Sequence, residues 1–422
     1  MSSISLISKR RISCLRGAGL VAALAVAAMA CSNDGGSGGG SAVGARFEKP
    51  PGFNSTVFKI TPAADGTGDL YIGGDFTSYN GTMVNRVARL RADGTVNLSF
   101  ATGAGFNGSV WSIVLAGDGT GDLYVGGNFS SYNGRAVNRL VRLHSDGTVN
   151  PNLQTGIGFN NTVYSIALAE DGTGNLYVGG AFTSYNGIAV ARLVRLLPDG
   201  LVDQSFTTGT GFTGPGLTTS VRIIVPAADG TGRIYVGGDF TSYNQQTPAN
   251  DLVRVNPNGS ADLFFATGSG FNNAIYSIAL AGDGTGDLYV GGAFTSYNQQ
   301  TPVNNVVRLH SNGIVNPTFA TGTGFNGSVW SIAPAGDGTG NLYVGGAFTT
   351  FNGTVANDLV RLHANGTVDA TFATGAGFDN LVYSIAPAGD GTGNLYVGGV
   401  FTTYQSTTTG RIVRLSSQGA TN

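Results

Sequence analysis

Charge and cysteine are both scarce in this chain of 422 residues. Charged residues make up only 11% of it, a composition typical of sheets that are buried on both faces. Four basic residues lie in the first thirty, and without them the balance of basic and acidic residues is 18 − 24 = −6. An acidic surplus argues against a nucleic-acid partner. No segment has a sustained helical period.

The N-terminal segment predicts export and anchoring. Residues 1–30 combine a basic start, an apolar run too short to span a bilayer, and Ala28-Met29-Ala30, the pattern of a signal peptide. Cys14 leaves with the signal, so Cys31 has no disulfide partner in the mature chain. The segment resembles a bacterial lipoprotein signal, although that family has Leu and a smaller residue in place of Ala28 and Met29. We expect Cys31 to carry lipid and residues 31–44, rich in Gly and Ser, to form a flexible tether. A secreted protein with a stray thiol is the alternative.

The rest of the chain repeats one unit seven times. The glycines that open the copies are Gly52, Gly105, Gly158, Gly211, Gly270, Gly324 and Gly377. Their spacings are therefore 53, 53, 53, 59, 54 and 53 residues. A period of this length indicates a solenoid, an array or a propeller.

The two ends of the repeat region complement each other. The seventh copy stops at Asn422, which aligns with Asn97, and so lacks the tail that carries a Phe before the next Gly-Phe. That tail precedes the first copy, with Phe47 in register with Phe100. A ring explains this arrangement, because the N-terminal strand completes the last sheet. We predict an all-β, seven-bladed β-propeller over residues 45–422, with four-stranded antiparallel blades and a ring closed by the N-terminal strand.

Turn residues divide each copy into four strands. In the second copy we expect strands over residues 110–116, 123–132, 139–144 and 150–155. Asp118-Gly119-Thr120-Gly121 and Asp146-Gly147 are tight hairpin turns, in which Asp bonds the local backbone and Gly supplies a positive φ.

The recurring DG turn, YVGG-x-F strand, RL-x-x-DG strand and D-x-x-F segment resemble the delta-60 repeat family of bacterial β-propellers. The resemblance covers nearly all of residues 45–422. The downstream Trp of kelch repeats and the Gly-His and Trp-Asp pairs of WD repeats are missing from this sequence. The resemblance implies the fold and leaves the function open, because that family is mostly known as surface or secreted proteins of undefined role.

Three recurring polar positions were candidates for chemistry. The DGTG turns could hold calcium, but Arg233 stands where most copies have Asp or Asn after the turn, which favours a plain hairpin. One Arg per copy on the third strand, such as Arg142, is expected to be a structural clamp between blades. His144, His310 and His363 share one outer register in separate blades, so no metal site and no cofactor are expected.

The first strand of each blade is expected to line the channel, with one of two adjacent series facing the axis. The first series is Phe58, Trp111, Tyr164, Arg222, Tyr276, Trp330 and Tyr383. The second is Lys59, Ser112, Ser165, Ile223, Ser277, Ser331 and Ser384. Neither series contains paired carboxylates or a nucleophile with a base. The aromatic residues are expected to form core between blades rather than a ligand cage.

Blade four departs most from the repeat. Its loop over residues 213–220 is longer, and Arg222 replaces an aromatic residue. Blades four and five also carry Asn-Gln-Gln-Thr-Pro where other blades have mostly Asn-Gly. The candidate ligand-binding residues are therefore Arg222, Asn244, Gln245, Gln246, Asn298, Gln299 and Gln300. Neutral drift in exposed loops explains the departures equally well.

From these features we expect a monomeric, non-enzymatic lipoprotein of the bacterial cell envelope, at the outer membrane or cell surface. We expect it to bind or display a glycan or protein partner. The alternatives are an envelope propeller enzyme, acting on polysaccharide or using a quinone cofactor, and a purely structural surface module.

Overall fold

A computed structural model describes residues 52–214, 219–245, 249–299 and 303–422. The chain divides into two units, residues 1–48 and 49–422, and the described residues all belong to the second. The predicted signal peptide, Cys31, Phe47, Gln246 and Gln300 lie outside the described residues. None of the described segments forms an apolar helix of membrane-crossing length.

The described residues form seven three-stranded antiparallel sheets, one for each repeat. The inner strands are β1 (Val57–Pro62), β6 (Val110–Leu115), β11 (Val163–Leu168), β17 (Ser220–Pro226), β21 (Ile275–Leu280), β24 (Ser328–Pro334) and β29 (Val382–Pro387). The middle strands are β2 (Leu70–Gly74), β7 (Leu123–Gly127), β12 (Leu176–Gly180), β18 (Ile234–Asp239), β22 (Leu288–Gly292), β25 (Leu342–Ala347) and β30 (Leu395–Gly399). The outer strands are β5 (Val87–Leu90), β10 (Leu140–Leu143), β15 (Leu193–Leu196), β20 (Leu252–Val255), β23 (Val306–Leu309), β28 (Leu359–Leu362) and β33 (Ile412–Leu415).

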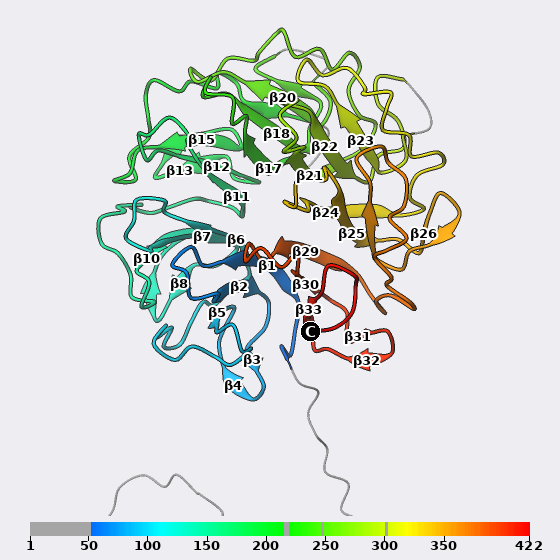
Figure 1. The fold of residues 1–422 in the computed structure, drawn as a ribbon. Helices are drawn as coiled ribbons and strands as arrows, with labels where there is room; N and C mark the ends of the chain where they lie inside the picture. Colours follow the sequence, from blue (N-terminus) through cyan, green and yellow to red (C-terminus); the bar gives the residue numbers. More distant parts are fainter. Residues whose placement is uncertain (1–51, 215–218, 246–248, 300–302) are drawn as a thin grey trace, which may run out of the picture. The chain divides into compact units, whose positions relative to one another are not determined.

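Each inner strand contacts the inner strands of the two neighbouring blades, and β1 contacts both β6 and β29. Figure 1 shows β1, in blue, beside β29 and β30 of the last blade. The first and last repeats are also hydrogen-bonded: Phe53 N donates to Gly410 O (2.8 Å), and the Arg411 side chain donates to Phe53 O (2.8 Å). The seven-bladed propeller is therefore confirmed. Its closure by the N-terminal strand lies outside the described residues and stays a prediction.

The fourth strand of each blade is shorter than the sequence suggested. In the second blade it is a single antiparallel bridge, Leu143 to Val149. Pairing ends there because the side-chain oxygen of Asn150 accepts a hydrogen bond from Asn152 N (2.8 Å), which turns the chain.

The predicted strand over 123–132 is likewise interrupted, by a turn after β7. A short hairpin of β8 (Ser131–Tyr132) and β9 (Arg135–Ala136) follows. The corresponding hairpins are β3 (Ser78–Tyr79) with β4 (Thr82–Met83), β13 (Ser184–Tyr185) with β14 (Ile188–Ala189), β26 (Thr350–Phe351) with β27 (Thr354–Val355), and β31 (Thr403–Tyr404) with β32 (Thr407–Thr408).

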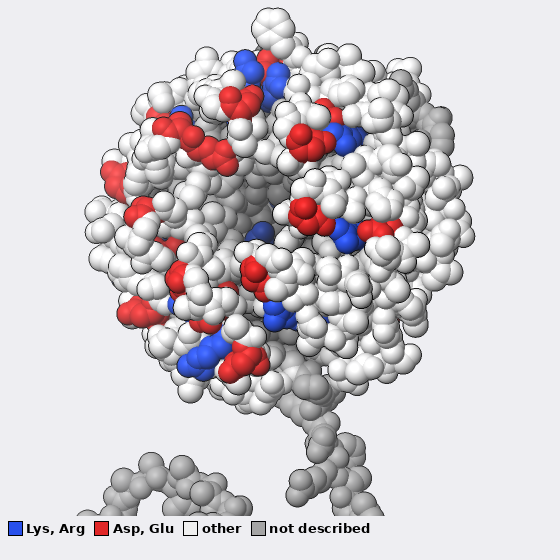
Figure 2. All heavy atoms as spheres, in the orientation of Figure 1, with Lys and Arg blue, Asp and Glu red and all other residues white. Residues whose placement is uncertain are grey.

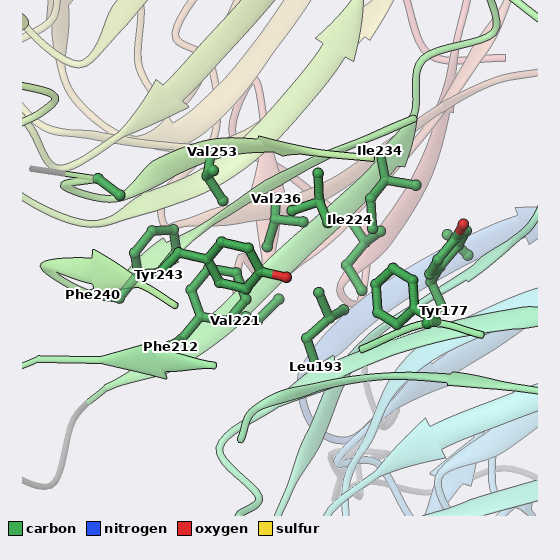
Figure 3. Packing of buried hydrophobic residues seen from close by; sticks show 14 of the residues in the cluster. Tyr177, Leu193, Phe212, Val221, Ile224, Ile234, Val236, Phe240, Tyr243 and Val253 are labelled. Carbon is green, nitrogen blue, oxygen red and sulfur yellow. The ribbon is translucent and has the colours of Figure 1, made fainter. Parts of the chain in front are cut away.

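The core lies between blades. In Figure 3, Tyr177 and Leu193 of the third blade pack against Val221 and Ile224 of the fourth. The paired glycines of the YVGG strand permit this close packing. A Cβ on Gly126 would lie 2.7 Å from the Val163 side chain of the next blade.

Candidate functional site in the central channel

Every inner strand carries a β-bulge at its second or third residue. In β6, Val110 pairs with Gly127 and Ser112 pairs with Gly126, so Trp111 is the extra residue. The same shift occurs in all seven blades. The bulged residues are Phe58, Trp111, Tyr164, Arg222, Tyr276, Trp330 and Tyr383. A bulge redirects side chains that strict alternation would send to opposite faces of the strand.

Both of the adjacent series identified in the sequence therefore line one cavity of about 320 Å³ at the centre of the ring. The expectation that the aromatic residues form core between blades is wrong. All seven bulged residues are partly exposed to the channel. The physical reason is the bulge, which lets neighbouring positions face the same space.

The bulged side chains touch one another in a closed circle. Phe58 and Trp111 are stacked with ring centroids 3.8 Å apart, and so are Tyr276 and Trp330 at 3.9 Å. Edge-on contacts complete the aromatic part, namely Trp111 with Tyr164 (5.7 Å), Trp330 with Tyr383 (5.1 Å) and Tyr383 with Phe58 (5.1 Å). Arg222 closes the circle, since its guanidinium lies 5.3 Å from the Tyr164 ring and 5.4 Å from the Tyr276 ring. We call this set the channel girdle.

The second series fastens neighbouring blades together. Ser112 Oγ accepts a hydrogen bond from Ile166 N of the next blade (3.2 Å). Backbone N–H groups of the following blades donate in the same way to the hydroxyl oxygens of Ser165, Ser277, Ser331 and Ser384. Two blades depart from it, because the first has Lys59 and the fourth has Ile223 at this position.

The channel's two basic residues each depart from the repeat: Lys59 replaces the serine of the second series, and Arg222 replaces the aromatic residue of the first. Lys59 and Arg222 are the charged residues that line the cavity, and the other lining residues described are aromatic, aliphatic or serine. The Lys59 amine has no hydrogen bond or ion pair with any described residue, and burial lowers its pKa. Arg222 Nε is likewise buried without a hydrogen-bond partner among the described residues. Figure 2 shows the hollow at the centre of one face, with a basic side chain visible inside it.

Carboxylates outside the cavity lining act on the tyrosines of the girdle. Asp239 adds to the effect of burial in raising the pKa of Tyr276, while Arg222 opposes it. Asp75 acts in the same way on Tyr383. Asp75 Oδ1 also accepts a hydrogen bond from Ser109 Oγ (2.5 Å). The channel thus combines aromatic rings, hydroxyl groups and two basic side chains that have no ion pair with any described residue.

The recurring Arg of the outer strand is a clamp, as predicted, but its ion pairs lie within its own blade. Arg142 Nε donates to Asp122 (2.8 Å), and the same guanidinium bonds Asp118 and the Tyr124 hydroxyl. The other oxygen of Asp118 accepts bonds from the Thr120 backbone (3.1 Å) and hydroxyl (2.6 Å). The DGTG carboxylates are therefore engaged by their own turn and by the clamp, except in blade four, where Asp229 bonds its own turn and Arg254 pairs with Asp262. Three clamps also donate to a carbonyl of the next blade: Arg254, Arg308 and Arg361.

The histidines lie on the outer strand register in separate blades. His144 and His310 contact Asp122 and Asp287 (both 3.1 Å), and His363 contacts Asn341 (3.2 Å). Within the described parts of the chain, no three His, Cys, Asp or Glu side chains gather as metal ligands would.

Of the predicted ligand-binding residues, Arg222 belongs to the girdle, whereas the described loop residues do not line the channel cavity. β16 (Phe212–Thr213) pairs with β19 (Ser242–Tyr243), so the long loop of blade four begins with a short ladder. Asn298 Oδ1 accepts a hydrogen bond from Ser269 N (3.1 Å), the same turn-stabilising bond that Asn133 makes with Ala104 N. Asn244 occupies the matching turn position with a φ of 49°. Gln245 and Gln299 are exposed.

Blades four to six share a further departure that the sequence reasoning missed. In the other blades an Arg before the outer strand donates to the Phe carbonyl of the next blade, as Arg139 does to Phe159 O (3.0 Å). Asp251, Asn305 and Asp358 stand at this position in blades four, five and six. Burial raises the pKa of Asp251 and of Asp358 to about 7. The only sequence signal was the loss of Arg at a repeated position.

A protein-family model described as "Domain of unknown function (DUF5122) beta-propeller" matches seven segments of this chain. The segments are residues 66–100, 118–152, 172–206, 230–265, 284–319, 338–372 and 391–421. Among curated proteins, none matches the sequence.

Solved structures with similar folds share 14% sequence identity with the chain. The WD40 β-propeller domain of Doa1 has a TM-score of 0.51, with 83% of this chain and 92% of that one covered. A chain of the mitotic checkpoint complex has a TM-score of 0.50, with 90% and 98% covered. The extracellular domain of the hybrid two component system BT3049 from B. thetaiotaomicron has a TM-score of 0.49, and the match spans 82% of this chain but 39% of that one. At this identity the likeness concerns the fold alone.

Proposed function

The chain belongs to the DUF5122 β-propeller family, and from this premise we propose that it is a cell-envelope lipoprotein whose propeller binds a glycan or protein partner without catalysing a reaction. The observation that carries the proposal is the channel girdle. Its side chains are partly exposed, and two pairs of its aromatic rings are stacked. Partly exposed aromatic rings in a preformed cavity are typical of ligand sites.

Binding is favoured over catalysis by the chemistry of the cavity lining. Serine hydroxyls there accept hydrogen bonds from the next blade, as Ser112 does from Ile166 N, which occupies them in holding the ring together. Arg222 supplies positive charge, and Lys59 adds a second when an anionic ligand favours its protonated form, so that the two can orient a ligand. Most glycoside hydrolases use a pair of carboxylates at the reacting bond, and the described lining consists of aromatic, aliphatic, serine and basic residues instead.

Anchoring rests on the N-terminal pattern. The predicted lipid at Cys31 and the tether over residues 31–44 would hold the propeller near a membrane surface and leave its faces accessible. Full-length protein should partition with the membrane fraction, and Cys31→Ser should move it to the soluble fraction. Cys14→Ser is the matched control, because Cys14 lies in the predicted signal and its loss should change neither the lipid nor the partition.

The partner can be sought with the purified, signal-processed protein on a glycan array and by pull-down from envelope extract. Saturable binding of a glycan class or one envelope protein supports the proposal. Turnover of a polysaccharide in the same incubation would replace it with the enzymatic alternative. Replacing residues 213–220 with the Asn-Gly-Ser linker of blade two, which precedes Val110, asks whether the loops contribute to the site.

A further inference from the structure

We propose that the central channel binds an anionic sugar unit, with Lys59 and Arg222 holding its acidic group and the channel girdle stacking on its ring. This inference rests on the proposed binding function and names the class of ligand. It concerns the channel, whereas the loops of blades four and five form the candidate surface predicted from the sequence.

The two cations are the first observation. They occur in the first and fourth blades, on different sides of a seven-blade ring, and both face the same cavity. Neither forms an ion pair with any described residue, whereas the outer-strand arginines all do. A buried or half-buried cation without a counter-charge is costly, and a carboxylate or sulfate on a ligand removes that cost.

The repeat itself shows that both cations are departures. Five of seven blades have a serine at the Lys59 position, and six of seven have an aromatic residue at the Arg222 position. The serine makes a hydrogen bond to the next blade that Lys59 does not make. The fold alone would be served by Ser at position 59 and Tyr at position 222, so the two cations require another explanation.

The girdle is the second observation. The two stacked pairs, Phe58 with Trp111 and Tyr276 with Trp330, present aromatic surface at the cavity wall. Aromatic faces pack against the C–H surface of a sugar ring through dispersion and burial of apolar area. The cavity of about 320 Å³ lies at the small end of ligand sites, which fits one or two sugar units and not a folded protein partner.

The chain contains a built-in reporter for this site. It has two tryptophans, Trp111 and Trp330, and both belong to the girdle. Intrinsic tryptophan fluorescence therefore measures ligand entry with no added label. The probe is galacturonate and its dimer, titrated into the signal-processed protein at low ionic strength, where charge contributes most. Galactose is the neutral match, and acetate and inorganic phosphate are the anions without a sugar ring.

The variants restore the repeat instead of deleting structure. Lys59→Ser recreates the residue of blade two, and Arg222→Tyr recreates that of blades three and five. Arg233→Asn is the control, since it removes a cation outside the channel and recreates the Asn175–Asp203 pair of blade three (3.2 Å). Each channel variant should weaken galacturonate binding by about tenfold, and the control should leave it unchanged.

Three outcomes would overturn the inference. They are no fluorescence change with either acidic probe, equal binding of galactose, and binding of acetate or phosphate as tight as that of galacturonate. A partner found on the array or by pull-down whose binding falls on the loop graft but not on Arg222→Tyr would leave the proposed function standing and place its site on the loops. Salt-sensitive galacturonate binding that is lost in Lys59→Ser and Arg222→Tyr, while both variants melt cooperatively, supports the inference.

Discussion

Phe47→Ala should destabilise the propeller as much as removal of a buried core phenylalanine. In five of the other six blades a terminal Phe packs edge-on against the Tyr of the middle strand, as Phe372 does on Tyr343 with centroids 5.2 Å apart. Phe372 is 5% exposed. In the seventh blade, the corresponding Tyr396 borders a groove of about 460 Å³ at the seam with the first blade.

The outer strand of the seventh blade is also less covered than its equivalents in the other blades. β33 is partly exposed at Ile412 and Val413, whereas the outer strands of the other blades are buried throughout. Burying roughly 150–200 Å² of a Phe side chain at about 25 cal/mol per Å² contributes about 4–5 kcal/mol. This agrees with the range of about 3–5 kcal/mol for Phe→Ala in a core.

The assay is urea unfolding of the signal-processed protein, followed by circular dichroism. Phe372→Ala, in the sixth blade, is the matched control for an internal site of the same design. Equal losses in the two variants would support closure by the N-terminal strand. A loss of several kcal/mol for Phe372→Ala with no loss for Phe47→Ala, or an unchanged melting temperature after deletion of residues 45–51, would refute it.

Four further outcomes are expected. Cys31→Ser should release the protein from membranes, and mass spectrometry of the wild type should show the lipid. Lys59→Ser should raise the free energy of unfolding at pH 7 by about 1 kcal/mol, because the serine can accept a hydrogen bond from Ile113 N. Burial lowers the Lys59 pKa in the folded state, so the wild type should gain stability as pH rises toward 10.5, and this gain should be missing from Lys59→Ser. Asp251 has a folded pKa of about 7, above its unfolded value of 3.8, so the folded state binds the extra proton and stability should fall by about 3 kcal/mol as pH rises from 4 to 7. Thermal melts should show this fall reduced in Asp251→Asn. The graft of the Asn-Gly-Ser linker over residues 213–220 should leave the melting temperature unchanged, because loop length costs little, and should weaken partner binding by at least about tenfold if the loop contacts the partner.

The sequence alone was enough for the architecture. Seven copies with hairpin turns at fixed places, together with the low charge, predicted a seven-bladed all-β ring, because a repeated unit that cannot bury its own faces must stack on its neighbours. It also predicted that the recurring Arg is a clamp and that the histidines stay apart, since equivalent positions of different blades diverge outward. These inferences need only periodicity and residue type.

The site depended on the tertiary structure. In a strand with strict alternation, only one of Trp111 and Ser112 could face the channel. The single-residue bulge at Trp111 lets both side chains face it. A bulge shifts register by one residue without any marker in composition, so the aromatic series was assigned to the core. That Lys59 and Arg222 line the same cavity also depended on the tertiary structure. The two residues lie far apart in the chain and share a cavity only because the ring brings the inner strands around one axis. Composition and repetition determine which blades form, and the registers between strands determine which side chains face the channel.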